Sequence, residues 1–443
     1  MLTNHVREAC LTGSRLFLDI YLKSRNSSLY NNAFYLMLNT LSTSLLGFVF
    51  WNVMTRFFVP TQVGIGSALV SASSLVGILT GLGLRIGLIR FVPEIRERAV
   101  LLINASFTLV GLVSLIGAIT YLAGIKYWSP ALEFVRENIV FLLLFMFFTV
   151  VNALSVLIDG SLIAGRDAKY VFWKNTITSI LKMPLPILIF AHLKGFGIFA
   201  GVGTGIAVGV FIAWLFFLPK VYKGYFPRPA IAKDIMQKVL PYSFANYTAN
   251  LLNLSPKYIY PLMVLNILGP ENSAYFYIAW MMSMVLSIIP SGISQSLLAE
   301  GSHNPKKMGR DGRKVLLLSL GMSIPAVVSM MLFGGWLLHF FGPGYAENGT
   351  TVMRYLVLAM IPQCINTLFI TINQVKKQTY LIIAQTSFLA IVSLGVAYWL
   401  LGRVGLPGIG IAYLTAHMFL SLVIIRPLWI ALKEKSYAPS AKI

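Results

Sequence analysis

The sequence predicts an all-α membrane protein with about twelve transmembrane helices, arranged as two six-helix bundles in a 6+6 repeat. Three observations lead to this prediction. The chain of 443 residues is 57% hydrophobic and only 11% charged, whereas soluble domains carry about 25% charged residues. Apolar segments of about 20 residues, each long enough to cross roughly 30 Å of hydrocarbon, recur along the chain. Finally, its two halves match at one constant offset.

Apolar periodicity gives the order of the helices. The first six are predicted at 31–55, 62–88, 99–124, 138–160, 170–193 and 196–219, and the second six at 240–266, 273–299, 314–341, 350–373, 378–402 and 405–432. The longest connection, 220–238, contains Gly224, two prolines and five basic residues, which is typical of a linker. The predicted divisions are a basic N-terminal segment at 1–30, an N-terminal lobe at 31–226, a C-terminal lobe at 227–435 and a tail at 436–443.

Basic residues gather on one side of this topology. The predicted loops and termini place 26 Lys and Arg residues on one side and six on the other. Such a bias in short loops places the basic side in the cytoplasm. We therefore expect a multi-pass protein of the inner (cytoplasmic) cell membrane with both termini cytoplasmic. The net charge of +21 then reflects orientation and contact with membrane lipids, and it does not indicate a nucleic-acid partner.

The first thirty residues are polar and basic and show no cleavable signal peptide. Leu16, Phe17 and Ile20 have the spacing of an amphipathic surface helix, and a flexible tail is the equal alternative. The two cysteines, Cys10 and Cys364, form no disulfide framework or metal-ligand pattern. We expect no metal and no cofactor.

The internal repeat has an offset of 210 residues. It pairs residues at matching places in the two sets of helices: Pro60 with Pro270, Phe34 with Phe244, Tyr170 with Tyr380 and Gly195 with Gly405. One offset that holds across six helices indicates a true repeat. Because six is an even number, both halves have the same orientation, and a substrate site is expected between them near the middle of the membrane.

Several short motifs resemble a known family. They are VGIGSAL at 63–69, GLGL at 81–84, IRFVPE at 89–94 and AGRDAKY at 164–170. They are similar to segments of the oligosaccharide flippases, which share a superfamily with the multidrug and toxin extruders and the lipid II flippase. The resemblance implies two bundles around a central cavity lined mainly by helices 1, 2, 7 and 8. It also implies movement of a polyprenyl-diphosphate-linked glycan from the cytoplasmic to the outer leaflet.

Helix 7 carries a polar stripe that suits such a substrate. Its members recur every three or four residues and fall on one helix face: Tyr242, Asn246, Asn250, Asn253, Lys257 and Tyr260. Amide and phenol groups can bond sugar hydroxyls, and a Lys offers positive charge to a diphosphate. The alternative is that the Asn residues bond neighbouring helices. For the serines of helices 2 and 8, and for His417 in helix 12, packing is the favoured interpretation.

Three further basic residues are candidates for contact with the substrate. Lys182 falls inside helix 5 before Pro184, and a charge at this depth normally faces water or a partner. We interpret it as a second cation of the cavity, with snorkelling or pairing to a backbone carbonyl as the alternative. Arg56 lies near an outer helix end, where interface anchoring is the favoured interpretation, although it could also meet the departing diphosphate. Arg90 lies at the cytoplasmic end of helix 2, where it could receive the headgroup.

The acidic residues favour a flippase over its alternatives. All fourteen Asp and Glu residues fall in predicted loops or near helix ends, whereas cation-drug antiporters of the same superfamily usually need a carboxylate inside the membrane. A multidrug extruder is nevertheless the closest alternative. A glycosyltransferase or polymerase would need catalytic residues in a sizeable outer loop, and the predicted outer loops are short. We therefore predict a transporter rather than an enzyme. Its partners would be the lipid-linked glycan and glycosyltransferases or a polymerase of the same pathway.

Overall fold

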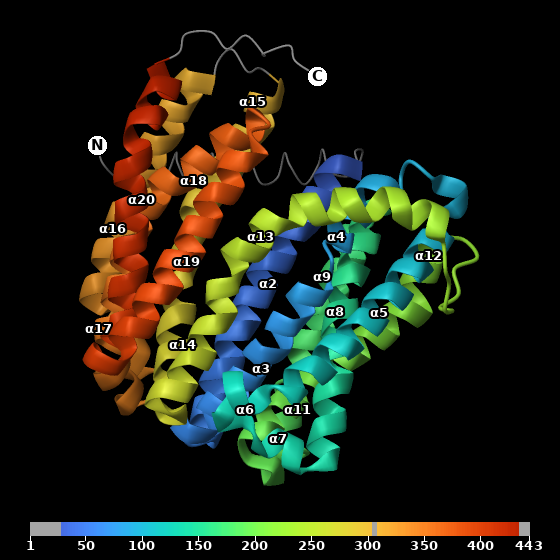
Figure 1. Cartoon of the computed structure of the whole chain (residues 1–443), viewed down its shortest axis with the longest axis horizontal. Helices are drawn as coiled ribbons and strands as arrows, with labels where there is room; N and C mark the ends of the chain where they lie inside the picture. Colours follow the sequence, from blue (N-terminus) through green and yellow to red (C-terminus); the bar gives the residue numbers. More distant parts are fainter. Residues whose placement is uncertain (1–27, 304–307, 434–443) are drawn as a thin grey trace, which may run out of the picture.

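The computed structural model describes residues 28–303 and 308–433, which form helices joined by short turns and contain no β-strand. Figure 1 shows two bundles side by side, the N lobe in blue to green and the C lobe in yellow to red. We call the end where the described chain starts and finishes, at Ser28 and Lys433, the basic end. The opposite end, which holds Arg56 and Pro270, is the far end. The predicted N-terminal surface segment, with Cys10, lies outside the described residues.

The N lobe contains α2 (Ser28–Phe57), α3 (Pro60–Thr80), α4 (Leu84–Phe91), η1 (Arg96–Arg98), α5 (Ala99–Ala123), α6 (Ile125–Trp128), η2 (Pro130–Leu132), α7 (Phe134–Glu137), α8 (Ile139–Ala164), α9 (Ala168–Leu181), α10 (Leu185–Leu188), η3 (Ala191–Leu193), α11 (Lys194–Ile212), η4 (Ala213–Phe217) and α12 (Leu218–Val221). The C lobe contains α13 (Lys233–Leu268), α14 (Pro270–Met284), η5 (Val285–Ser287), α15 (Ile288–His303), α16 (Met308–His339), α17 (Pro343–Leu358), α18 (Met360–Val375), α19 (Thr379–Val404) and α20 (Pro407–Lys433).

Ten spans in the described chain are long and apolar enough to cross a membrane. The other two predicted crossings are α9 with α10, and α13. The first is short and broken, since α9 has only 14 residues. The second has 36 residues but contains four charged residues and three prolines. These two segments carry Lys182 and Lys257, so the two crossings that do not meet the criterion of length and composition are those in which substrate contacts were predicted.

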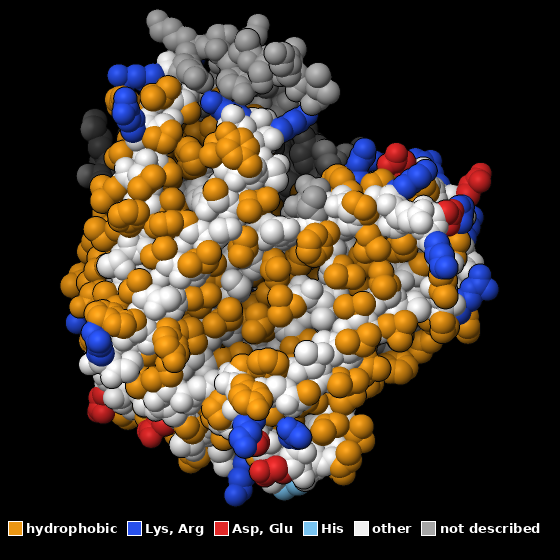
Figure 2. Space-filling view, viewed as in Figure 1, with side chains coloured by type: hydrophobic (Ala, Val, Ile, Leu, Met, Phe, Trp, Pro, Cys, Tyr) orange, Lys and Arg blue, Asp and Glu red, His pale blue; other side chains and the backbone are white. Residues whose placement is uncertain are grey.

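The surface agrees with a membrane-spanning protein. Figure 2 shows hydrophobic side chains over the middle of the visible face, while Lys and Arg gather towards its two ends. Large apolar side chains such as Leu41, Leu45, Leu332 and Trp336 are exposed. In a soluble protein these patches would favour aggregation, whereas in a bilayer they contact hydrocarbon.

The predicted repeat appears in the helix boundaries. Pro60 and Pro270, which the 210-residue offset pairs, are the first residues of α3 and α14. Proline suits this position because the first turn of a helix leaves its N–H groups unbonded. Tyr170 and Tyr380 likewise lie in the first turns of α9 and α19. The two-lobe repeat is therefore confirmed.

Several predicted helices are broken where a continuous helix was expected. Predicted helix 5 ends at Leu181, and Pro184 precedes the short α10. Proline lacks the N–H that would continue the ladder. Predicted helix 2 is divided between α3 and α4, helix 8 between α14 and α15, and helix 10 between α17 and α18.

Gly83 explains the break in helix 2. Its φ is +68°, a conformation that glycine adopts easily. A Cβ atom there would lie 2.4 Å from the backbone oxygen of Ser243 and 2.5 Å from the Cβ of Tyr247. The GLGL motif therefore lets α13 cross directly over the start of α4. Beside this crossing, Met236 and Val239 of α13 belong to an apolar cluster of the N lobe.

Consequently α13 joins the two lobes. It begins at Lys233, seven residues before the predicted start, and its first part packs on the N lobe. Figure 1 shows it running across the basic end of the N lobe and then turning down into the middle of the molecule. Its last part packs with α14 in the C lobe, where Val264 lies in the main apolar core.

Candidate substrate site between the lobes

The middle of α13 presents three of the predicted polar residues. Asn250, Asn253 and Lys257 are all exposed. They lie on one side of the helix, because steps of three and four residues return to the same face. Asn246 lies one turn earlier in α13, and its side chain is outside the described part of the structure. The amides and the ammonium group are therefore available to a ligand in this conformation.

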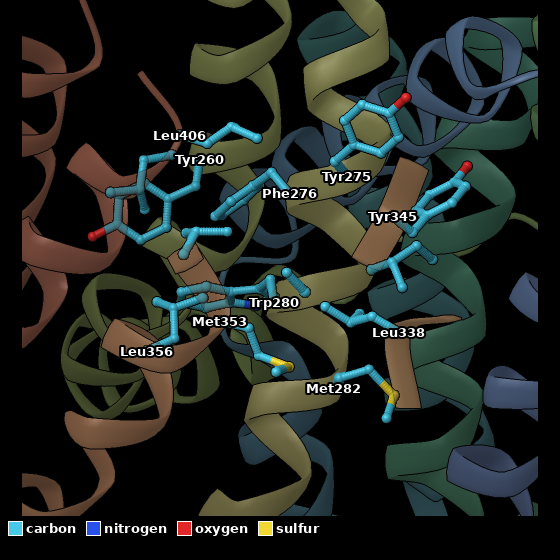
Figure 3. Packing of buried hydrophobic residues seen from close by; sticks show 14 of the residues in the cluster. Tyr260, Tyr275, Phe276, Trp280, Met282, Leu338, Tyr345, Met353, Leu356 and Leu406 are labelled. Carbon is cyan, nitrogen blue, oxygen red and sulfur yellow. The ribbon is translucent and has the colours of Figure 1, made fainter. Parts of the chain in front are cut away.

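The two tyrosines of the stripe lie elsewhere. Tyr242 packs edge-on against Phe91, with ring centroids 5.4 Å apart, at the contact of α13 with α4. Tyr260 has no exposed surface. It lies against Phe276 and Trp280, with centroids 6.1 and 5.3 Å away, and Figure 3 shows it within this apolar core. The expectation that Tyr260 faces a cavity is wrong for this conformation, because the helix dips into the C lobe there.

Lys182 is the first residue after α9, at the break in helix 5. Its Nζ lies 5.1 Å from the centroid of the Phe50 ring, a cation–π distance. Among the described residues it forms no ion pair with an acid. The alternative considered for it, pairing with a backbone carbonyl, is not seen in the described part of the chain; an aromatic face of α2 lies beside the charge instead.

A row of aromatic rings links Lys182 to Lys257. From α2, Phe50 contacts Trp51 at 5.1 Å between centroids, and Trp51 contacts Tyr277 of α14 at 4.6 Å. The Tyr258 side chain of α13 lies near that of Tyr277. The Nζ of Lys257 lies 5.3 Å from the centroid of the Tyr258 ring. We call Phe50, Trp51, Tyr277 and Tyr258 the aromatic row. It crosses the interface between the lobes with one lysine at each end.

The sequence interpretation missed this row because it followed polar side chains only. The adjacent pair Phe50 and Trp51 in helix 1 was the available signal. Nothing in the sequence shows that Tyr277, more than 200 positions away, lies beside Trp51. Aromatic rings offer flat apolar faces with polar edges, which suits a ligand that has both apolar and hydroxyl-bearing surfaces.

At the far end, two side chains of the N lobe donate hydrogen bonds to one backbone oxygen of the C lobe. Arg56 donates a hydrogen bond of 2.7 Å to the backbone oxygen of Phe340, and the side-chain amide of Asn52 donates to the same oxygen at 2.8 Å. Both donors belong to α2 of the N lobe, and Phe340 follows α16 of the C lobe. Arg56 therefore helps to connect the two lobes at the far end. We call these three residues the Phe340 latch.

A second interlobe contact lies at the same end. Asn266 of α13 donates to the backbone oxygen of Trp128 at 2.9 Å and accepts from the N–H of Ala131 at 3.4 Å. Nearby, a Cβ atom on Gly64 would lie 1.7 Å from the backbone oxygen of Pro270. Helices α3 and α14 therefore touch backbone to backbone. In this conformation the far end is closed.

Lys174 is not a loop cation, contrary to its place in the charge count. Its side chain is buried in α9, and its Nζ lies 2.7 Å from Oδ1 of Asp159 in α8. It also donates to the Ser155 hydroxyl at 2.8 Å. Asn175 donates to Asp159 at 3.4 Å and to Asn39 of α2 at 3.0 Å. Asp159 therefore lies inside a lobe, five residues before α8 ends, but its charge is already paired.

Other predicted polar groups are used for packing. The side-chain amide nitrogen of Asn366 donates to Nδ1 of His417 at 3.0 Å, and the Ser421 hydroxyl donates to the side-chain oxygen of Asn366 at 3.0 Å. The hydroxyls of Ser67 and Ser283 donate to backbone oxygens one turn earlier. Arg90 is exposed on α4 at the basic end. The packing interpretation of the serines and His417 thus agrees with the structure.

Comparisons with known proteins show which family the chain belongs to. The chain matches the polysaccharide biosynthesis protein family over residues 29–296 and the MatE family over residues 241–399. A comparison with curated proteins gives no significant match.

Solved transporters share the fold. An inward-facing multidrug resistance MATE family transporter of the MOP superfamily is similar with a TM-score of 0.61 and 18% identity, covering 90% of this chain and 96% of that chain. An outward-facing multidrug resistance MATE family transporter has a TM-score of 0.56 and 15% identity, covering 93% of this chain and 96% of that chain. A MOP superfamily transporter from Pyrococcus furiosus has a TM-score of 0.52 and 15% identity, covering 91% of this chain and 95% of that chain.

The family match covers more than half of the chain, and the structural matches span nearly all of it. Together with the two-lobe repeat and the apolar surface, they establish a multi-pass membrane protein. The chain belongs to the polysaccharide biosynthesis protein family, with the fold of the MOP superfamily.

Proposed function

We propose that the protein is a flippase, which moves a polyprenyl-diphosphate-linked oligosaccharide from the cytoplasmic to the outer leaflet for surface glycan assembly. One observation supports this most strongly. Lys182 and Lys257, one from each side of the lobe interface, lie at the two ends of the aromatic row without an acidic partner among the described residues. An unpaired charge inside a membrane protein is costly, and it normally serves a ligand of opposite charge.

In this proposal the basic end faces the cytoplasm. The diphosphate binds Lys257 and Lys182, because both ammonium groups are free of carboxylates. The sugars lie along Asn250 and Asn253, whose amides can donate to and accept from hydroxyl groups. The lipid tail stays in the bilayer, so only the polar head needs a path through the protein.

Transport then follows from rocking of the two lobes. The Phe340 latch closes the far end while the substrate enters from the basic end. Opening the far end breaks the two hydrogen bonds to Phe340 and those of Asn266. Arg56 loses its partner at that moment, and its guanidinium group becomes available to the departing diphosphate. Arg90, exposed on α4, is placed to meet the headgroup on arrival.

A multidrug extruder is the second candidate, because the MatE match and the multidrug transporters among the similar structures favour it. Such a protein would offer a carboxylate to a cationic drug. Here the most deeply placed described acid, Asp159, is already paired with Lys174, and the interface carries lysines. The Pyrococcus furiosus transporter is itself described as having a binding pocket of reverse polarity that suggests a different function.

A liposome assay separates the two candidates. The purified protein would be reconstituted with a polyprenyl diphosphate carrying a fluorescent oligosaccharide, and dithionite added outside would quench the label on that leaflet only. We expect the quenched fraction to rise from about half to nearly all the label when the protein is present, since flipping exposes the inner pool. Protein-free liposomes set the background. Uptake of ethidium without movement of the glycolipid would instead identify a drug transporter.

A further inference from the structure

A cavity of about 790 Å³ lies at the interface of the lobes, and none of the four residues of the aromatic row lines it. We call it the interlobe groove. Its apolar walls come from both lobes: Leu75, Val76 and Leu79 of α3 on one side, and Ile259, Leu262 and Met263 of α13 on the other. Its volume is within the range of small-molecule sites. Nothing in the proposed path of the glycan uses it.

The groove opens on the surface that contacts lipid. Leu79 in its wall is 53% exposed, and Ile116, which precedes the lining residue Gly117 on α5, is 62% exposed. Because the protein spans a membrane, these apolar side chains face hydrocarbon rather than water. The groove runs beside the last ten residues of α13, so it occupies the half of the membrane near the far end.

The mouth of the groove has the composition of a membrane interface. Tyr127, Trp128 and Tyr398 line it, together with Asn266. Tyrosine and tryptophan gather at headgroup level because their rings are apolar and their tips are polar. Lys126 directly precedes Tyr127 and is exposed, so a cation is also near the mouth. A deep apolar interior under an aromatic, polar rim fits an amphiphile that has a hydrocarbon chain.

We propose that the interlobe groove binds one acyl chain of a bilayer phospholipid from the leaflet at the far end, with its headgroup at the Tyr127 and Trp128 rim. A phospholipid fits this conformation better than the transported polyprenyl chain does. Phospholipid is the bulk lipid of the leaflet that the groove opens to. With the far end closed, the substrate is still on the side of the basic end. The choice of phospholipid over the polyprenyl chain rests on the proposed function, whereas the lining of the groove and its opening to lipid do not.

Binding would act on the conformation because both lobes form the walls. Asn266 lines the groove and also makes the interlobe hydrogen bonds to Trp128 and Ala131. A chain in the groove touches both lobes only while the far end is closed. Packing contacts, rather than release from water, drive such binding in a membrane. The bound lipid therefore favours the closed far end.

Photo-crosslinking tests the site directly. The full-length protein would be reconstituted in phosphatidylethanolamine and phosphatidylglycerol liposomes, with a trace of phosphatidylcholine carrying a diazirine at the end of one acyl chain. Mass spectrometry would locate the adducts. We expect labelling at Leu75, Leu79 and Met263 to exceed labelling at the exposed residues Ile116 and Ile119 several-fold, although all five side chains are apolar.

Matched variants make the result specific. Leu79→Trp fills the groove from an exposed position and is expected to lower its labelling at least threefold. Ile116→Trp makes the same change on neighbouring lipid-facing surface and should leave the groove labelling unchanged. Met263→Trp, from the opposite wall, should repeat the loss if Leu79→Trp does not insert normally.

Two outcomes would overturn the proposal. Labelling that follows exposure alone, unchanged in Leu79→Trp and Met263→Trp, would show that the groove holds no ordered chain. Displacement of the label by a small mole fraction of polyprenyl phosphate, but not by equal unlabelled phosphatidylcholine, would assign the groove to the polyprenyl tail instead.

Discussion

Removing both donors of the Phe340 latch should open the far end. The perturbation is the pair Asn52→Ala and Arg56→Ala, which deletes the hydrogen bonds of 2.8 and 2.7 Å. A neutral hydrogen bond contributes about 0.5–1.5 kcal/mol and one from a charged donor about 1.5–3 kcal/mol. Both bonds are exposed and share one acceptor, so their contributions are reduced and do not add. We expect a combined loss of about 1–2 kcal/mol from the closed state.

This loss corresponds to a rise of roughly 5- to 30-fold in the ratio of open to closed far ends, since about 1.4 kcal/mol is a factor of ten. Spin labels at Val59 and Glu347, both exposed at the far end on different lobes, would report the distance by double electron–electron resonance. The double variant should gain a longer-distance population. Arg403→Ala is the control, because Arg403 stacks on Trp399 and makes no interlobe bond in the described structure.

An unchanged distance distribution in the double variant would refute the reasoning. It would mean that the helix contact of α3 with α14 closes the far end alone. A longer distance that appears equally in Arg403→Ala would also refute it, because the effect would then come from loss of surface charge.

Three other perturbations follow from the structure. Lys174→Met leaves Asp159, whose side chain is only 20% exposed, without its partner. Breaking a fully buried pair costs about 3–5 kcal/mol and this pair less, so thermal unfolding in detergent should show a loss of stability that Lys174→Met with Asp159→Leu largely restores. Gly64→Val must separate two backbones at Pro270, and overpacking of about 1–3 kcal/mol should raise the open population in the same spin-label assay. Arg98 forms an ion pair with Asp234 at 2.6 Å, and its hydrogen bond lowers the pKa of Asp234. That ion pair therefore stabilises the protein at neutral pH and is lost as pH falls through the lowered pKa, so the difference in unfolding temperature between wild type and Asp234→Asn should disappear in acid.

Much of the fold follows from the sequence because hydrophobic length and prolines act locally. Pro60 and Pro270 start the helices that their repeat predicts. The break after Lys182 was less visible, because it depends on how Pro184 and its neighbours pack. Likewise, the hydrophobicity of a stretch of sequence cannot show that the chain bends at Leu82 and Gly83, where α13 packs against it.

The site was harder to predict, since its members meet only in three dimensions. The exposed Asn250, Asn253 and Lys257 share a helix, so their spacing was informative. Lys174 was misplaced because a loop count ignores burial, and its partner Asp159 lies on another helix. Tyr260 has the right spacing for the stripe, but α13 enters the C-lobe core before it.

The central claim is that the two lysines of the aromatic row receive the diphosphate. The most direct measurement is the dithionite assay with Lys257→Gln and Lys182→Gln, each beside Lys126→Gln, which removes an exposed charge outside the row. We predict that both row variants insert normally and slow glycolipid flipping at least tenfold, while Lys126→Gln flips at the wild-type rate. Wild-type rates in both row variants would contradict the account.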